Sequence, residues 1–199
     1  MSSFDLDKAF VSGSFSDDEE GIETERNPND NPSKRILLAA ENGRLETLKA
    51  LLEENPELIN VTDKEGYSPL HRACYGNHVE TVKYLLQNGA NIAAKTELQW
   101  EPLHSCCRWN HIESAQILLA EGADVNAPSE GGQTPLHIAA SHGACYDMVQ
   151  LLLMHPYINP NLKNISGETA FDIARRSSKY RNVFDMVDPL LDYNNIELN

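Results

Sequence analysis

Apolar and polar positions recur along this chain with a fixed long period. Three tetrapeptides of the form x-Pro-Leu-His begin at Ser68, Glu101 and Thr134, so their prolines stand 33 residues apart both times. Two small residues follow each His, and a later apolar segment carries paired leucines at 85–86, 118–119 and 152–153. A period of this length is typical of stacked helical repeats that share one elongated core. The pattern therefore predicts an all-α solenoid.

Each tetrapeptide has the composition of a helix start. The hydroxyls of Ser68 and Thr134 suit a helix cap that accepts a bond from an unpaired backbone N–H, and proline needs no donor in the first turn. Glu101 departs from the hydroxyl pattern, although a carboxylate also caps and interacts favourably with the helix dipole. An Asn or Gly six residues after each His tolerates left-handed backbone and is expected to end the helix.

The tetrapeptides, the small residues and the period are together identified as the ankyrin repeat, a helix-turn-helix unit with a short hairpin loop. The resemblance implies that His71, His104 and His137 bond to neighbouring backbone and to the Ser or Thr hydroxyl, which ties one repeat to the next. About five units fit the chain. We divide it into an acidic leader (1–33), an N-terminal capping unit (34–66), three full repeats (67–99, 100–132 and 133–167), a C-terminal capping unit (168–190) and a flexible tail (191–199).

Two repeats depart from the common pattern. Gln99 stands at the hairpin tip of the second full repeat, where its neighbours have Gly66 and Gly132, and this predicts a strained or differently shaped turn. The third full repeat is two residues longer, and we assign the extra residues to the region of Ala144 and Cys145. A longer loop between its two helices is expected.

Charge and cysteine content restrict the partners and the compartment. With 30 acidic and 16 basic residues the net charge is −14, which argues against direct contact with nucleic acid but permits binding to basic protein segments. No apolar run reaches the roughly 18 residues of a membrane span, and the N-terminus lacks a secretory signal. We therefore expect an intracellular monomer without membrane contacts or cofactors, whose four cysteines are reduced thiols.

The acidic leader contains nine acidic and two basic residues, with dispersed apolar ones. This composition cannot bury enough surface to fold, so the leader is expected to be disordered. It is interpreted either as a solubilising tail or as an interaction tail resembling activation segments. Ser16 precedes four consecutive acidic residues and is a candidate for phosphorylation by an acidophilic kinase.

The resemblance also implies a protein-binding groove on the concave face, built from hairpin tips and the exposed side of each first helix. Trp, Tyr and Arg dominate interface energetics, and they concentrate in the first half of the array. Trp100, at a hairpin position predicted to face solvent, is the expected centre of the site. Trp109 is a second candidate, with packing against the neighbouring repeat as the alternative. The predicted protein-binding residues are Lys64, Tyr67, Tyr75, Leu98, Trp100, Arg108, Trp109, His142 and Arg176.

Catalysis and metal binding find little support. His71 with Cys74, and His104 with Cys106, Cys107 and His111, have spacings compatible with zinc ligands. However, His71 and His104 belong to the repeat motif, and the cysteines occupy positions where the fold demands small residues. The sequence has no phosphate loop, nucleophile elbow or convergent carboxylate pair. We therefore predict neither a metal site nor enzymatic activity.

A narrower resemblance is carried by residues 70–75, 102–110 and 168–176 and covers about four fifths of the chain. It is to ankyrin repeat proteins regarded as nuclear, non-enzymatic and linked to transcriptional control, and it implies a nuclear adaptor. The alternative is a cytoplasmic scaffold or a chaperone-like binder of a basic client. The wider family further implies that Asn60 and Asn126 are candidates for asparaginyl hydroxylation, with turn stabilisation as their other role.

Overall fold

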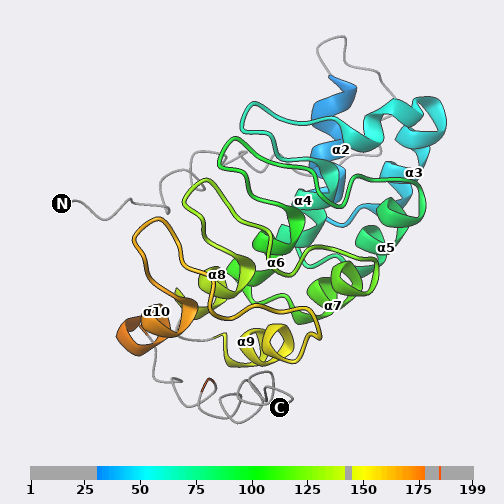
Figure 1. Cartoon of the computed structure of the whole chain (residues 1–199). Coiled ribbons are helices and arrows are strands. Elements are labelled where there is room, and N and C mark those ends of the chain that lie inside the picture. The colour runs from blue at the N-terminus through cyan, green and yellow to red at the C-terminus, as the bar shows by residue number, and fades with distance from the viewer. Residues whose placement is uncertain (1–30, 142–144, 178–183, 185–199) are drawn as a thin grey trace, which may run out of the picture. The chain divides into compact units, whose positions relative to one another are not determined.

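The computed structural model describes residues 31–141, 145–177 and 184, which form helices arranged in two layers (Figure 1). The first layer contains α2 (Pro32–Glu41), α4 (Pro69–Tyr75), α6 (Pro102–Trp109), α8 (Pro135–Ser141) and α10 (Ala170–Ser177). The second contains α3 (Leu45–Glu54), α5 (Val79–Gln87), α7 (Ile112–Ala120) and α9 (Tyr146–Leu153), with a 3-10 helix, η1 (Pro56–Asn60), after α3. Successive helices of the first layer pack against one another, as do α5, α7 and α9 in the second. The predicted all-α, helix-turn-helix architecture is confirmed.

The first helices begin where the tetrapeptides place them. In α4 the Ser68 Oγ accepts a bond from the backbone N–H of His71, and the His71 side chain binds the backbone N–H of Ser68 in return. In helix α6 the backbone N–H of Glu101 likewise donates to His104 Nδ1, at 3.1 Å. Helix α2 begins at Pro32, two residues before the predicted boundary of the capping unit, because Asn31 caps it and proline suits the first helical turn.

The second helices begin at residues that reach back to the preceding unit. His78 Nε2 lies 2.8 Å from the backbone oxygen of Glu41, and His111 Nδ1 lies 2.8 Å from that of Cys74. In the third full repeat the equivalent residue is Cys145, whose Sγ lies 4.0 Å from the backbone oxygen of Cys107. These contacts tie each unit to its predecessor, and they were not predicted from the sequence.

The two extra residues of the third full repeat are not in one place, which corrects the sequence-based assignment. The helix caps His111 and Cys145 stand 34 residues apart, so one extra residue lies before α9. The Asn60 side chain bonds to Gly89 and Asn91, which are 29 and 31 positions later. The equivalent Asn126 side chain bonds to Tyr157 and Asn159, which are 31 and 33 positions later. The second extra residue therefore lies between Cys145 and Tyr157.

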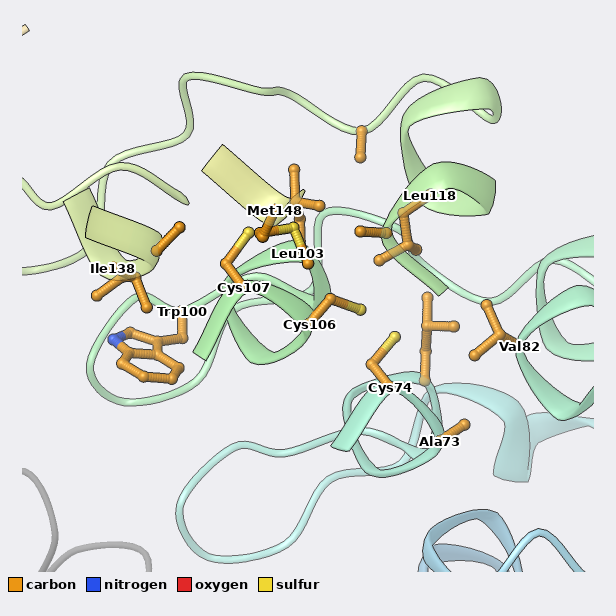
Figure 2. Packing of buried hydrophobic residues seen from close by; sticks show 14 of the residues in the cluster. Ala73, Cys74, Val82, Trp100, Leu103, Cys106, Cys107, Leu118, Ile138 and Met148 are labelled. Atoms are coloured by element: carbon orange, nitrogen blue, oxygen red, sulfur yellow. The ribbon is translucent and has the colours of Figure 1, made fainter. Parts of the chain in front are cut away.

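The core runs through both layers, where leucines from the first four units are fully buried. The four cysteines are free and buried; Cys74, Cys106 and Cys107 occupy positions that demand small side chains, and Cys145 caps α9. Figure 2 shows Cys74, Cys106 and Cys107, and the thiols of Cys74 and Cys106 lie against each other. Burial raises the pKa of the Cys74 and Cys107 thiols well above the usual value, so both remain neutral and act as small apolar residues.

Two buried side-chain oxygens of the described residues have no hydrogen-bond partner, Ser105 Oγ and Asn110 Oδ1, and the second has a structural explanation. Asn77 and Asn110 both end their helices with positive φ, at 54° and 59°. The Asn77 Oδ1 accepts a bond of 2.9 Å from the Ser114 hydroxyl, but the buried Asn110 Oδ1 has no hydrogen-bond partner. Met148 stands three residues after the cap of α9, as Ser114 stands three residues after the cap of α7. Its apolar side chain therefore takes the place of the hydroxyl, and Asn110 loses its donor.

We therefore expect Asn110→Gly to stabilise the fold by about 1 kcal/mol, since it removes an unsatisfied buried acceptor and glycine accepts left-handed backbone. The melting temperature should rise by about 2–4 °C for a chain of this size. Asn77→Gly is the matched control and should destabilise, because it strands the buried Ser114 hydroxyl. Equal changes in the two melting temperatures would contradict this explanation.

Candidate functional site

The inner face consists of the hairpin tips between units and the exposed sides of the first helices. Neighbouring tips are joined by backbone bonds, in which Glu97 N–H donates to Glu65 O (2.9 Å) and Glu130 N–H donates to Leu98 O (3.0 Å). Gln99 takes the left-handed conformation of the glycines it replaces, with φ 59°. The predicted strain at this turn is confirmed, because Gln99 adopts a left-handed backbone that disfavours non-glycine residues. The tip keeps the shape of its neighbours.

A buried histidine lies behind each of three tips. The His71 Nε2 lies 3.0 Å from the backbone oxygen of Trp100, while its Nδ1 lies 2.9 Å from Ser68 Oγ and 3.2 Å from the Ser68 backbone N. A carbonyl only accepts, so the proton is on Nε2 and Nδ1 is the acceptor. His104 and His137 make the same bonds to Gln133 and Glu168. The role that the resemblance implied for these histidines is confirmed.

Burial determines the charge of these histidines. It lowers the pKa of His71 and of His104 to about 4, although the backbone carbonyl bonded to each ring acts in the opposite direction. The pKa of His137 is lowered for the same reason. Because both ring nitrogens of His71 already have hydrogen-bond partners, this ring is a structural tie between repeats.

No group of three or more His, Cys, Asp or Glu side chains in the described residues is arranged to hold a metal ion.

Trp100 does not face solvent, and this prediction was wrong. Only 6% of its surface is exposed, and its ring is stacked on the His104 ring with centroids 6.0 Å apart. Figure 2 shows Trp100 among the buried residues of the core. Tyr67, one repeat earlier, lies edge-on to His71 at 5.7 Å. The aromatic residue at this hairpin position therefore covers the buried histidine of its own repeat.

Tyr67 is half-buried within a charged cluster. The Arg72 guanidinium lies 5.0 Å from the Tyr67 ring centroid and bonds to carboxylate oxygens of Asp63 (2.6 Å) and Glu41 (3.3 Å). Burial raises the pKa of the Tyr67 hydroxyl, and the neighbouring Arg72 partly offsets this effect. These contacts hold the start of the inner face rigid and leave one carboxylate charge in excess.

The best candidate for a binding surface is formed by Tyr75, Arg108 and Trp109 at the C-terminal ends of α4 and α6. We call these three residues the aromatic cluster. The Trp109 and Tyr75 rings meet edge to face with centroids 5.4 Å apart, and the Arg108 guanidinium lies 5.3 Å from the Trp109 ring centroid. Trp109 keeps 39% of its surface exposed. The structure thus brings together three predicted site residues from two repeats.

The remaining predicted site residues are dispersed. Lys64 is exposed at the first tip and Leu98 is half-buried at the second. Arg176 is exposed on α10 and forms an ion pair with Glu168. His142 and Ser16 lie outside the described residues, as does the second half of the C-terminal capping unit except Phe184. Phe184 is buried against Phe171, with ring centroids 5.6 Å apart.

The two candidate hydroxylation sites have structural bonds. Asn60 Oδ1 accepts from the Asn91 N–H (2.8 Å), and Asn126 Oδ1 accepts from the Asn159 N–H (2.9 Å). Each side-chain amide also donates to a carbonyl of the following unit. Turn stabilisation accounts for both residues, and their hydroxylation stays a prediction.

Exposed carboxylates accompany the aromatic cluster on the inner face. Glu65, Glu97 and Glu130 lie at three successive hairpin tips, all exposed. The backbone bonds between tips place Glu97 directly next to Glu65.

Paired helices, stacked hairpins and a buried histidine tie in successive repeats define an ankyrin repeat protein, and the chain belongs to this family. Family models described as ankyrin repeats match residues 36–129 and 118–174. Members of the family are binding modules for other proteins and are generally not enzymes.

The chain is similar to ankyrin repeat domain-containing protein 49 of several organisms. It is 57% identical to that protein from Bos taurus and from Homo sapiens over 157 residues, which are 79% of this chain and 66% of each relative. It is 48% identical to the Drosophila melanogaster protein over 183 residues, 92% of this chain and 85% of the relative. The matched region thus spans just under two thirds of the mammalian relatives.

Proposed function

We propose that this chain is an intracellular adaptor that binds a protein partner on its inner face and acts in nuclear transcriptional regulation. The observation that carries the proposal is the aromatic cluster. An exposed tryptophan held between a tyrosine and an arginine is the composition of an interface hot spot. Its contacts fix the ring before binding, so little conformational entropy is lost when a partner covers it.

The nuclear role is proposed from the resemblance to nuclear ankyrin repeat proteins described in the sequence analysis. A second candidate is a cytoplasmic scaffold or a chaperone-like binder of a basic client. The observation that favours it is the row of exposed carboxylates at Glu65, Glu97 and Glu130. Imaging of a tagged full-length chain in cells separates the two compartments, since the adaptor proposal requires nuclear accumulation.

We expect Trp109→Ala to weaken partner binding by about tenfold or more, the effect of removing a hot-spot side chain. The fold should be retained because the residue is partly exposed. The measurement is quantitative affinity capture from nuclear and cytoplasmic extracts, with circular dichroism as the folding check. Gln87→Ala, an exposed change on the second helix layer, is the matched control.

Specific partners should be lost with Trp109→Ala and kept with Gln87→Ala. If Trp109→Ala retains every partner of the unchanged chain, the inner face is not the binding surface. Trp100 is not a suitable substitution for this test, because its burial would confuse lost binding with lost folding.

A further inference from the structure

Among the described residues, the most exposed large apolar side chains outside the inner face lie together in the turn that follows α9. Met154 is 74% exposed and Tyr157 is 80% exposed, with Pro156, also exposed, between them. Isolated exposed apolar residues need no explanation, but a methionine and a tyrosine in one turn form a local apolar patch. We call Met154 and Tyr157 the α9 patch.

The α9 patch is not a consequence of its place near the end of the stack. The corresponding turns after α5 and α7 contain Gln87, Gly89, Ala120 and Gly122 at the equivalent positions. All four are exposed, although a further repeat follows each of those turns. The third full repeat therefore has large apolar side chains at positions that stay in solvent throughout the array, and it has them where an extra residue lengthens the turn.

The backbone under the α9 patch is held in place by the preceding repeat. The Asn126 side chain donates to the Tyr157 carbonyl (2.7 Å) and accepts from the Asn159 N–H (2.9 Å). The His155 ring lies against the Tyr157 ring, with centroids 5.9 Å apart. A turn fixed in this way presents its side chains without a large loss of entropy when a partner binds.

Exposed carboxylates stand beside the α9 patch. The Asp124 Oδ1 accepts a bond of 2.8 Å from the backbone N–H of Asn126, the same residue that binds the Tyr157 carbonyl. Glu121 is exposed in the same turn, at the end of α7, and α7 packs against α9. The surface therefore combines an apolar patch in one repeat with two negative charges in the neighbouring repeat. Its complement carries a large apolar side chain and a Lys or Arg close to it.

We propose that the α9 patch is a second docking site, which binds a basic amphipathic segment of a partner protein. The site is separate from the inner face, because it lies at the end of a second-layer helix, so the adaptor is able to hold two polypeptides at once. The apolar side chain of the segment covers Met154 and Tyr157, and its cation lies between the Tyr157 ring and the Asp124 carboxylate.

The experiment places the photo-crosslinking residue p-benzoylphenylalanine at position 157 of the full-length chain in cells, with position 87 as the matched exposed control. Crosslinked peptides are identified by mass spectrometry. We expect adducts at position 157 and not at position 87, on a segment that contains an apolar residue near Lys or Arg. A synthetic peptide of that segment should then bind the purified chain at least tenfold more weakly after Met154→Ser with Tyr157→Ser, and with a reduced salt dependence after Asp124→Asn.

Several outcomes overturn the proposal: no adduct, equal adducts at both positions, an acidic segment, a nucleic acid, or a second copy of this chain. Unchanged peptide affinity in the double serine variant also overturns it. Trp109→Ala tests the inner face separately, because that change should leave the crosslink at position 157 intact. Failure of one site is thus distinguishable from failure of the other.

Discussion

Acidification from pH 7 to pH 4.5 is expected to unfold the repeat array. His71 and His104 are fully buried, and their pKa of about 4 lies below the ordinary value of 6.5. Below pH 6.5 the unfolded chain therefore binds more protons than the folded one, so stability falls as the pH falls and stops falling near pH 4. Each extra proton bound by the unfolded chain lowers the free energy of unfolding by about 1.4 kcal/mol per pH unit. The two sites together remove on the order of 6 kcal/mol, comparable with the whole stability of many domains.

The geometry explains why the rings resist protonation. In His71 the Nδ1 accepts from the backbone N–H and faces the hydroxyl of Ser68, so a proton there would place donor against donor in a dry site. Urea unfolding at a series of pH values measures the effect. His104→Gln should be less stable at pH 7 but should lose about half of the pH dependence. Glu101 offsets the trend slightly, because burial raises the pKa of its carboxyl. Stability that stays constant between pH 6.5 and 5 would contradict the prediction.

The sequence was sufficient to predict the repeat architecture because the period restricts each residue to one structural role. A proline after a cap residue, a small residue at a helix crossing and an Asn at a helix end each have one solution in a stacked helix pair, as Asn77 and Asn110 show with their positive φ. His78 and His111 were missed, although they too stand 33 residues apart. Their spacing was the available signal, and only the structure shows which carbonyls they bind.

The candidate site was predictable in position but not in exposure. Register places Trp100 and Trp109 on the same side of the array, yet exposure depends on what each ring contacts. The Trp100 ring stacks on the face of the His104 ring in its own repeat. The Trp109 ring, at a helix end, lies edge-on to Tyr75 and beside the Arg108 guanidinium, and 39% of its surface stays exposed. Neither contact is encoded by the period, so the period alone could not show which tryptophan is available to a partner.

Trp100→Ala is expected to destabilise the fold by about 3–5 kcal/mol, the usual cost of truncating a buried aromatic residue to alanine. The ring is 6% exposed and covers His104, so its loss leaves a cavity and admits water to a histidine that the fold keeps neutral. Trp109→Ala, at 39% exposed, should cost only about 1–2 kcal/mol. Urea unfolding at pH 7 measures both changes in the free energy of unfolding.

Fluorescence gives an independent test of the same assignment. In Trp109→Phe the emission comes from Trp100 alone and should be protected from iodide, whereas in Trp100→Phe the emission comes from Trp109 and should be quenched. Trp100→Phe also preserves a stacked ring, so it should cost less than Trp100→Ala. Equal quenching of the two tryptophans, or equal losses of stability in the two alanine variants, would show that Trp100 is exposed. The adaptor would then have two exposed tryptophans on its inner face, and the binding site would extend over the hairpin tips as well as the helix ends.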